Sequence, residues 1–286
     1  MRSGFVTFVG RPNVGKSTLL NQILGSKVAI TSDKPQTTRS QVRGVLHAVT
    51  DVEGTDEDVQ IVFVDTPGVH KPRTTLGQRL NDTATGALSD VDVPCLVVDA
   101  TAKIGPGDRF VAARVAKTGI AILNKIDAAT QDQVLAQLVD LSELGFSEYV
   151  PVSAKTGEGV DTLLKLLVDR MPEGPPFYPD DVVRETPDEV WVAELVREQL
   201  LAVTRDEVPH SIACRVTEWE DARIRVEILV ERDSQKGIVI GHKGSVLKEV
   251  GTRVRTQLPE GTFLELAVKV EKDWQRRPES LNRLGF

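Results

Sequence analysis

The chain has 286 residues, of which 40% are hydrophobic and 27% are charged, and its net charge is −7. This composition is ordinary for a folded globular chain, and the length suffices for two domains with sizeable cores. The acidic balance argues against a generally basic nucleic-acid binder but leaves room for a local basic patch. No apolar run approaches membrane-spanning length, and we expect a cytoplasmic protein with two reduced cysteines and no signal peptide.

A glycine-rich turn lies between a strand and a helix near the start of the sequence. Residues 4–9 form a short apolar run suited to a buried strand, and the apolar residues of 19–24 have helical spacing before Gly25. The turn matches the phosphate-binding pattern G-x-x-x-x-G-K-[ST], whose backbone N–H groups and helix dipole surround a phosphate chain. Lys16 supplies charge to the outer phosphates, and the Ser17 hydroxyl can bind Mg²⁺. The predicted nucleotide-binding residues here are Gly10, Arg11, Pro12, Asn13, Val14, Gly15, Lys16, Ser17 and Thr18.

A polar loop and two strands follow the first helix. Segment 26–40 has no clear periodicity and is expected to act as a mobile switch. Residues 41–52 and 59–64 predict two strands, and a short acidic connection at 53–58 joins them as a hairpin.

The second of these strands runs into Asp65-Thr66-Pro67-Gly68. Asp-x-x-Gly is weak in isolation, but this aspartate comes 49 residues after Lys16, a separation typical of nucleotide hydrolases. The Asp65 carboxylate can hold a Mg²⁺-bound water, and the Gly68 N–H can contact a γ-phosphate. Loss of that contact on hydrolysis would release the following segment, 66–75. The predicted catalytic residues are Lys16, Thr38 and Gly68, and the predicted Mg²⁺ ligands are Ser17, Asp65 and Thr38, with Thr37 as the alternative to Thr38.

Three further strand–helix units predict a mostly parallel sheet with helices on both faces. The predicted strands are 94–100, 120–123 and 149–152, and the predicted helices are 107–117, 131–144 and 160–171. In such a fold, ligands bind at the carboxyl ends of the strands, which is where the motifs of this chain fall.

The last two of these strands end in Asn124-Lys125-Ile126-Asp127 and Ser153-Ala154-Lys155. The Asp127 carboxylate can accept two hydrogen bonds from guanine N1–H and the exocyclic amine, which adenine cannot offer. Asn124 and Lys125 are expected to brace the loop and the ring face. Ser153-Ala154-Lys155 is expected to close the other edge, with the Ala154 N–H toward the guanine oxygen. The predicted nucleotide-binding residues of these later motifs are Asp65, Thr66, Pro67, Gly68, Asn124, Lys125, Asp127, Ser153, Ala154 and Lys155. Each short motif is common by chance, but four of them in this order at successive strand ends indicate that the bound nucleotide is GTP. The predicted fold class is therefore α/β, a Ras-like P-loop GTPase.

A proline-rich segment at 172–187 is expected to be a semi-rigid spacer between a GTPase domain at 1–171 and a second domain at 188–286. The second domain predicts a helix at 188–204, strands at 211–218 and 222–231, a Gly-x-x-Gly loop, a helix at 245–257 and a strand at 262–270. This order of elements resembles a type II K-homology (KH) domain, an α+β fold whose Gly-x-x-Gly loop clamps the backbone of single-stranded RNA.

The Gly-x-x-Gly loop lies in a locally basic segment. Residues 232–255 carry six basic and two acidic residues, a net charge of +4 within an acidic chain. Such a run can be a solvated face, but here it flanks a loop whose glycines allow close approach to a sugar–phosphate backbone. The predicted RNA-binding residues are Lys236, Ile240, Gly241, His242, Lys243, Gly244 and Lys248.

Several longer stretches accompany these motifs. They are residues 10–21, 36–39, 65–70, 124–127, 173–179, 207–210, 230–236, 240–244 and 283–286. Over essentially its whole length the chain resembles the Era family of bacterial ribosome-associated GTPases, although Glu189-Val190 departs from the Arg-Phe usual at the start of the KH helix.

The resemblance implies binding of GTP and GDP with Mg²⁺ as cofactor. It also implies binding near the 3′ end of 16S ribosomal RNA and a role in assembly of the 30S subunit. The alternative is a second domain that docks a protein or membrane surface, so a peripheral membrane association stays open.

Two positions bear on the rate of hydrolysis. Val69 stands where Ras-like proteins have a glutamine that orients the attacking water, so slow unaided turnover is expected. GTPases that share Gly-Arg-Pro-Asn-Val-Gly-Lys-Ser are associated with a K⁺ ion beside the phosphates, held by the asparagine. Asn13 is thus either a K⁺ ligand or a side chain that stabilises its own loop.

Asp127→Asn is expected to move nucleotide preference from GTP to xanthosine triphosphate. The 2-oxo group of xanthine needs a hydrogen-bond donor, which the asparagine amide supplies and the carboxylate does not. Competition binding of the two triphosphates measures the change, and an unchanged preference for GTP would overturn the assignment of Asn124–Asp127.

Overall fold

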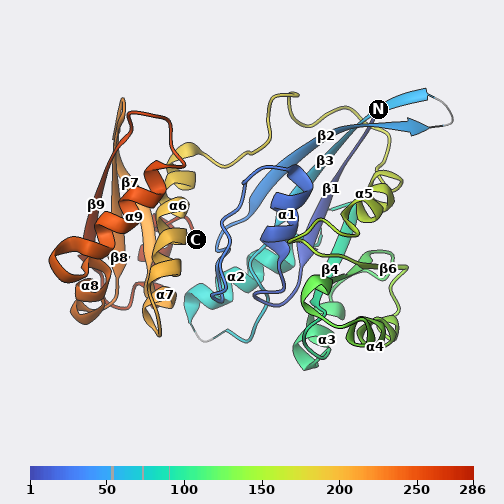
Figure 1. Ribbon diagram of the computed structural model, residues 1–286, viewed down its shortest axis with the longest axis horizontal. Helices are drawn as coiled ribbons and strands as arrows, with labels where there is room; N and C mark the ends of the chain where they lie inside the picture. The colour runs from blue at the N-terminus through green and yellow to red at the C-terminus, as the bar shows by residue number, and fades with distance from the viewer. Residues whose placement is uncertain (53–54, 73, 90) are drawn as a thin grey trace. The chain divides into compact units, whose positions relative to one another are not determined.

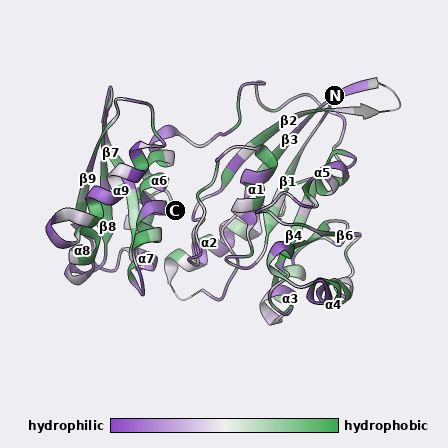
Figure 2. Cartoon of the chain, viewed as in Figure 1, coloured by the Kyte–Doolittle hydropathy of each residue, from purple (hydrophilic) through white to green (hydrophobic). Residues whose placement is uncertain are grey.

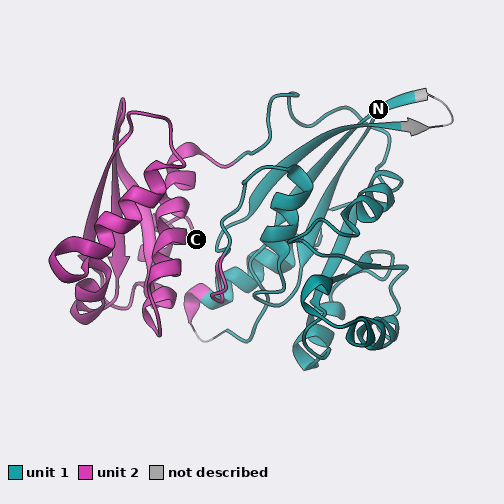
Figure 3. Cartoon of the chain, in the orientation of Figure 1, with its two compact units in different colours: residues 1–31, 38–72, 77–185 teal, residues 32–37, 73–76, 186–286 magenta. Residues whose placement is uncertain are grey.

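The structure is a computed structural model that describes residues 1–52, 55–72, 74–89 and 91–286. The chain divides into two compact units, coloured separately in Figure 3. The first unit comprises residues 1–31, 38–72 and 77–185, and the second comprises residues 32–37, 73–76 and 186–286. Each unit has its own sheet and its own hydrophobic core.

A six-stranded sheet forms the centre of the first unit (Figure 1). Its order is β2-β3-β1-β4-β5-β6, and every neighbouring pair is parallel except β2 with β3. The strands are β1 (Arg2–Val9), β2 (Val42–Val52), β3 (Thr55–Asp65), β4 (Val93–Asp99), β5 (Ile120–Asn124) and β6 (Glu148–Pro151). Buried apolar runs such as those of β4 and β5 suit a sheet that is covered on both faces, which confirms the predicted α/β class.

Helices cover both faces of this sheet. They are α1 (Lys16–Leu24), α2 (Thr75–Gly86), α3 (Pro106–Ala112), α4 (Gln131–Ser142) and α5 (Val160–Val168). One core cluster joins the sheet to α1 and α5 through Leu19, Leu20 and Leu163. The other joins it to α2, α3 and α4 through residues such as Ala84 and Leu141. Figure 2 maps the hydropathy of these elements in the same view.

The first unit differs from the sequence-based expectation in three elements. Helix α2 was not predicted, and α3 ends at Ala112 rather than at 117. Strand β3 begins at Thr55, so the predicted acidic connection 53–58 lies largely in the strand, and its residues 53–54 lie outside the described residues. The antiparallel ladder explains the difference, because it extends as far as the pairing of Val52 with Thr55 and so includes residues 55–58.

The proline-rich segment as far as Glu185 packs against the first unit. Gln60 of β3 is fully buried, and its Oε1 accepts hydrogen bonds from the Phe177 and Tyr178 N–H groups at 2.7 and 3.0 Å. The Gln60 Nε2 donates to the Tyr178 carbonyl at 2.8 Å. Farther along, the Val45 N–H of edge strand β2 donates to the Val183 carbonyl at 2.9 Å. The segment thus supplies partners for an otherwise open sheet edge.

The second unit pairs helices with a three-stranded sheet of order β7-β8-β9. Its elements are α6 (Asp188–Val203), α7 (Val208–Ser211), β7 (Ala213–Glu220), β8 (Arg223–Val230), α8 (Asp233–Ile240), α9 (Ser245–Arg255), β9 (Phe263–Val270) and α10 (Pro278–Arg283). Strands β7 and β8 are antiparallel, and β8 and β9 are parallel. One core unites α6 and α9 with the sheet, through Val196, Leu200 and Val254 among others. This arrangement confirms the predicted α+β fold of a type II KH domain.

Two details of the second unit differ from expectation. The apolar run before the Gly-x-x-Gly loop is helix α8, which was not predicted. The hairpin turns at Asp221, whose φ is 48°, so Trp219 and Glu220 belong to β7 and not to the connection. No helix within the described residues is both long enough and apolar enough to cross a membrane.

Gln60→Leu is expected to lower the free energy of unfolding of the first unit by about 2 kcal/mol, because the substitution leaves three backbone partners without their side-chain bonds. Urea unfolding of the full chain, following the transition that GDP stabilises, measures the effect. Gln131→Leu at an exposed glutamine is the matched control. Equal midpoints for both variants would show that Gln60 does not hold the proline-rich segment.

Candidate nucleotide site

The phosphate-binding loop connects β1 to α1 at the carboxyl end of the sheet. Gly15 has φ 94°, and α1 begins at the next residue, Lys16. A Cβ on Gly15 would lie 2.3 Å from the Asn124 Nδ2, and a Cβ on Gly10 would lie 2.4 Å from the Val97 carbonyl oxygen. The loop therefore lies directly on the ends of β4 and β5, where side chains larger than hydrogen do not fit.

Lys16 is buried in the phosphate-binding loop. Its Nζ donates to the carbonyl oxygens of Gly10 at 3.3 Å and Arg11 at 3.0 Å. Burial lowers the pKa of this ammonium to about 8, and the neighbouring Asp65 only partly offsets that effect. A polyphosphate would stabilise the charged form and raise this pKa again, so the lysine is suited to meet an anion.

Three oxygen-bearing side chains meet beside Lys16. The Ser17 Oγ donates to Asp65 Oδ2 at 2.6 Å, the Thr38 Oγ1 donates to the same oxygen at 3.2 Å, and the two hydroxyls are 2.9 Å apart. The other oxygen, Asp65 Oδ1, is buried and has no hydrogen-bond partner within the described residues. Hard oxygen ligands with one carboxylate oxygen to spare suit Mg²⁺ and its bound waters. The predicted ligands Ser17, Thr38 and Asp65 thus lie together.

Burial raises the pKa of the Asp65 carboxyl, whereas Lys16 and the two hydroxyls lower it. Thr37, the alternative switch threonine, has its hydroxyl bonded to the Lys34 carbonyl at 2.7 Å. Of the two neighbouring threonines, only Thr38 therefore reaches the carboxylate in this structure.

The Asp-x-x-Gly segment packs on the phosphate-binding loop. The Val69 N–H donates to the Gly10 carbonyl at 3.1 Å, and a Cβ on Gly68 would lie 2.6 Å from the Pro12 nitrogen. Thr66 is fully buried, and its hydroxyl donates to the Phe8 carbonyl at 3.0 Å. The hydroxyl of Thr66, a predicted nucleotide-binding residue, thus bonds to the neighbouring strand, and Gly68 lies beside the phosphate-binding loop.

Asn124 joins the base-binding segments to the phosphate-binding loop. Its Nδ2 donates to the Val14 carbonyl at 2.8 Å, and its Oδ1 accepts from the Ala154 N–H at 2.9 Å. The Ala154 N–H was expected to face guanine, whereas here it donates to the Asn124 side chain. Asp127 Oδ1 accepts from the Ser153 hydroxyl at 2.7 Å, while Lys155 is exposed.

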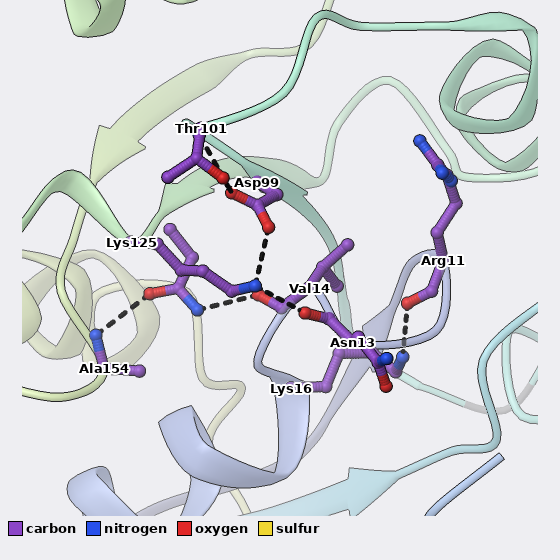
Figure 4. Close-up of polar contacts among 9 residues, drawn as sticks. Arg11, Asn13, Val14, Lys16, Asp99, Thr101, Lys125 and Ala154 are labelled. Carbon is purple, nitrogen blue, oxygen red and sulfur yellow. Dashed lines mark hydrogen bonds and ion pairs between the residues drawn. The ribbon is translucent and has the colours of Figure 1, made fainter. Parts of the chain in front are cut away.

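Two carboxylates near the loop were not singled out from the sequence. Asp99, the last residue of β4, lies 2.6 Å from the Lys125 Nζ, which also donates to the Asn13 carbonyl at 2.7 Å (Figure 4). Asp108 at the start of α3 is buried and lies 3.1 Å from the Arg11 guanidinium. Asp99 follows the same rule as the recognised motifs, a polar residue at the carboxyl end of a parallel strand, and that rule could have found it.

The predicted RNA-binding loop connects α8 to α9. Gly241 and Gly244 have φ values of 72° and 79°, and a short 3₁₀ turn, His242–Gly244, lies between the helices. His242, Lys243 and Lys248 are exposed, while Lys236, Ile240 and both glycines are partly buried. The loop therefore presents backbone and basic side chains to solvent, as an RNA clamp requires.

Family models match both units. A model described as a 50S ribosome-binding GTPase matches residues 5–125, and a KH domain model matches residues 207–275. The fold and the site thus define a P-loop GTPase joined to a KH domain.

Relatives extend the match to the whole chain. GTPase Era of a Nocardioides species is 49% identical over 309 residues and covers 100% of this chain and 96% of its own length. GTPase Era of Mycolicibacterium smegmatis is 49% identical over 303 residues, with 100% and 99% coverage. The chain belongs to the Era family of GTPases.

Two solved structures have the same fold over the full length. One is Aquifex aeolicus Era bound to GDP and AlF₄⁻, and the other is Era in complex with MgGDPNP and nucleotides 1506–1542 of 16S ribosomal RNA. Each is 39% identical to this chain with a TM-score of 0.91, and each alignment covers 100% of this chain and 99% of the other.

Thr38→Ala is expected to slow Mg²⁺-dependent GTP hydrolysis by about tenfold or more, the cost of one lost contact to a charged group. Thr37→Ala is the matched control, because its hydroxyl is bonded to a backbone carbonyl and does not meet Asp65. Single-turnover hydrolysis with saturating Mg²⁺ compares the two variants. Normal hydrolysis by Thr38→Ala with a defect in Thr37→Ala would reverse the assignment.

Proposed function

We propose that this GTPase is a nucleotide-controlled switch that binds the 3′-end region of 16S ribosomal RNA and acts in assembly of the 30S subunit. The observation that carries the proposal is the full-length similarity to an Era structure that holds MgGDPNP and nucleotides 1506–1542 of 16S ribosomal RNA. The exposed basic loop between α8 and α9 supports it, because it offers a backbone approach and positive charge for an RNA strand.

The residues at the strand ends divide the work of nucleotide binding. Ser17, Thr38 and Asp65 would hold Mg²⁺, which neutralises charge between the outer phosphates. Lys16 would exchange its two backbone carbonyls for phosphate oxygens, and the Gly68 N–H would contact the γ-phosphate. Asp127 would select guanine, and Asn124 with Lys125 would hold the base-binding loop.

Slow unaided hydrolysis follows from Val69, which is buried and carries no group to orient water. Asn13 is the residue proposed to bind K⁺ beside the phosphates. The support for this role is the position of Asn13, which is exposed at the tip of the phosphate-binding loop and has φ 65°. Equal hydrolysis rates in potassium and sodium salts would dismiss this role.

The proposed division of labour assigns GTP to residues 1–171 and RNA to residues 188–286, with 172–187 between them. A nucleotide can change RNA affinity only by the difference in free energy between its two states. The segments expected to respond to the γ-phosphate, 26–40 and 66–75, belong to the proposed GTPase domain, and the proposed RNA clamp belongs to the other domain. A semi-rigid spacer at 172–187 would let a change in the first domain alter how the second is presented.

RNA affinity is expected to be about tenfold higher with a GTP analogue than with GDP, within the usual range of coupling free energies. Filter binding of an RNA with the 3′-end sequence of 16S ribosomal RNA, with GDPNP or GDP present, measures it. Equal affinities in both states would show that the two domains do not share a switch. Absence of RNA binding in both would favour a protein or membrane partner.

A pair of variants at Gly244 tests the loop itself. A Cβ at Gly244 meets nothing within 4 Å, whereas a Cβ at Gly241 would lie 2.5 Å from Val246 Cγ2 and disturb α9. Asparagine and aspartate both tolerate positive φ, so they differ mainly in charge. Gly244→Asp is expected to lose RNA binding through repulsion of phosphates, and Gly244→Asn to retain most of it, with GTP binding unchanged in both.

A further inference from the structure

The carboxylate of Asp99 lies between the base-binding and phosphate-binding parts of the site. Strand β4 ends at Asp99, which pairs with Asn124 in the parallel ladder, and the Ala100 N–H donates to the Asn124 carbonyl at 2.8 Å. Asp99 therefore stands at the same level of the sheet as the first residue of the guanine motif.

The two oxygens of Asp99 have different partners. Oδ1 accepts hydrogen bonds from the Thr101 N–H at 2.9 Å and from the Thr101 hydroxyl at 2.6 Å, which fixes the turn after β4. Oδ2 lies 2.6 Å from the Lys125 Nζ (Figure 4). The carboxylate is thus oriented from one side and receives the lysine on the other.

Lys125 links that carboxylate to the phosphate-binding loop. Its Nζ also donates to the Asn13 carbonyl at 2.7 Å. Lysine has a long stem with several rotatable bonds, and an ammonium held by a single carbonyl would keep much of that freedom. Two oxygen partners, the Asp99 carboxylate and the Asn13 carbonyl, together define one position for the ammonium.

Both residues joined by this bond have unusual backbone conformations. Asn13 has φ 65° and Lys125 has φ 67°, a region that non-glycine residues adopt at a cost. The contact from Lys125 to the Asn13 carbonyl connects these two positions directly. Hydrogen bonds of this kind are what keeps such conformations populated.

We propose that Asp99 is a positioning residue for nucleotide binding, which fixes Lys125 so that the base-binding loop and Asn13 of the phosphate-binding loop keep one relative position. The ion pair is partly exposed, with 36% of the Lys125 side chain and 19% of the Asp99 side chain accessible, so its direct contribution to stability is small. The ion pair affects nucleotide binding because it orders the Lys125 side chain, which contacts both loops. The inference rests on the proposed role of residues 124–127 in binding guanine.

A double-mutant cycle with Asp99→Asn and Lys125→Met tests the proposal. Asparagine keeps the shape of aspartate but removes its charge, and methionine keeps most of the lysine stem but removes the ammonium. The readout is the dissociation rate of a fluorescent GDP from the full-length protein. Asp169→Asn, the same change at an exposed position after α5, is the matched control.

Asp99→Asn is expected to speed GDP release by about tenfold, the loss typical of one charge-assisted hydrogen bond. In the Lys125→Met background the same change is expected to alter the rate by less than twofold, because the ammonium that Asp99 positions is absent. Asp99→Glu retains the charge and is expected to fall between the wild type and Asp99→Asn.

Two results would overturn the proposal. One is a rate for Asp99→Asn within twofold of the wild type. The other is an equal effect of Asp99→Asn with Lys125 or Met at position 125, which would mean that Asp99 acts only through its turn with Thr101. Failure of the wild type itself to bind GDP would instead overturn the proposed function, so the two failures are distinguishable.

Discussion

The close approach of the phosphate-binding loop to the ends of β4 and β5 is the constraint on which the nucleotide site depends. Gly15 meets Asn124 and Gly10 meets the Val97 carbonyl at distances that exclude a Cβ. A Cβ on Gly68 would lie 2.6 Å from the Pro12 nitrogen. Segments that follow different strands are therefore packed closely against one another. The sheet itself thus sets the relative positions of the segments proposed to hold phosphate and base.

That arrangement places opposite charges in a buried site before any ligand arrives. Burial disfavours the ammonium of Lys16, whose pKa falls to about 8, and it disfavours the carboxylate of Asp65, whose pKa rises. A lysine whose pKa falls on folding destabilises the unliganded fold below that pKa, and the penalty is relieved as the pH rises through it. Phosphate oxygens and a cation would satisfy both groups. The charged forms of Lys16 and Asp65 are thus disfavoured by burial and would be favoured by a bound anion and cation.

Sequence patterns located the motif residues well because each motif is local and stands at a strand end. They failed where tertiary packing decides the structure. Helix α2 presents few apolar residues, chiefly Leu76, Leu80 and Ala84 at four-residue spacing, in a stretch rich in threonine and glycine. In α8, Gly237 and the β-branched residues after it resemble a strand, but Val239 packs in the core.

Side chains whose contacts are with residues distant in sequence were also not recognised from sequence patterns. Gln60 is the one polar residue of the apolar run 59–64, and its three partners lie 117 or 118 positions away. The strand-end rule marks Asp99 in the sequence, but its contact with the Lys125 ammonium depends on the tertiary structure. Long-range pairs of this kind follow from the topology of the sheet, so they become visible only once the strand order is known.

The charge pattern of the second unit bears on where RNA would meet it. On the sheet, basic and acidic side chains pair across strands: Arg215 with Glu227, Arg223 with Glu265, and Arg225 with Glu218. Paired charges present little net potential to a phosphate backbone. Lys243 and Lys248 near the Gly-x-x-Gly loop make no ion pair within the described residues. The attraction for the RNA strand that we propose as a ligand would therefore lie with the loop between α8 and α9, although the chain as a whole is acidic.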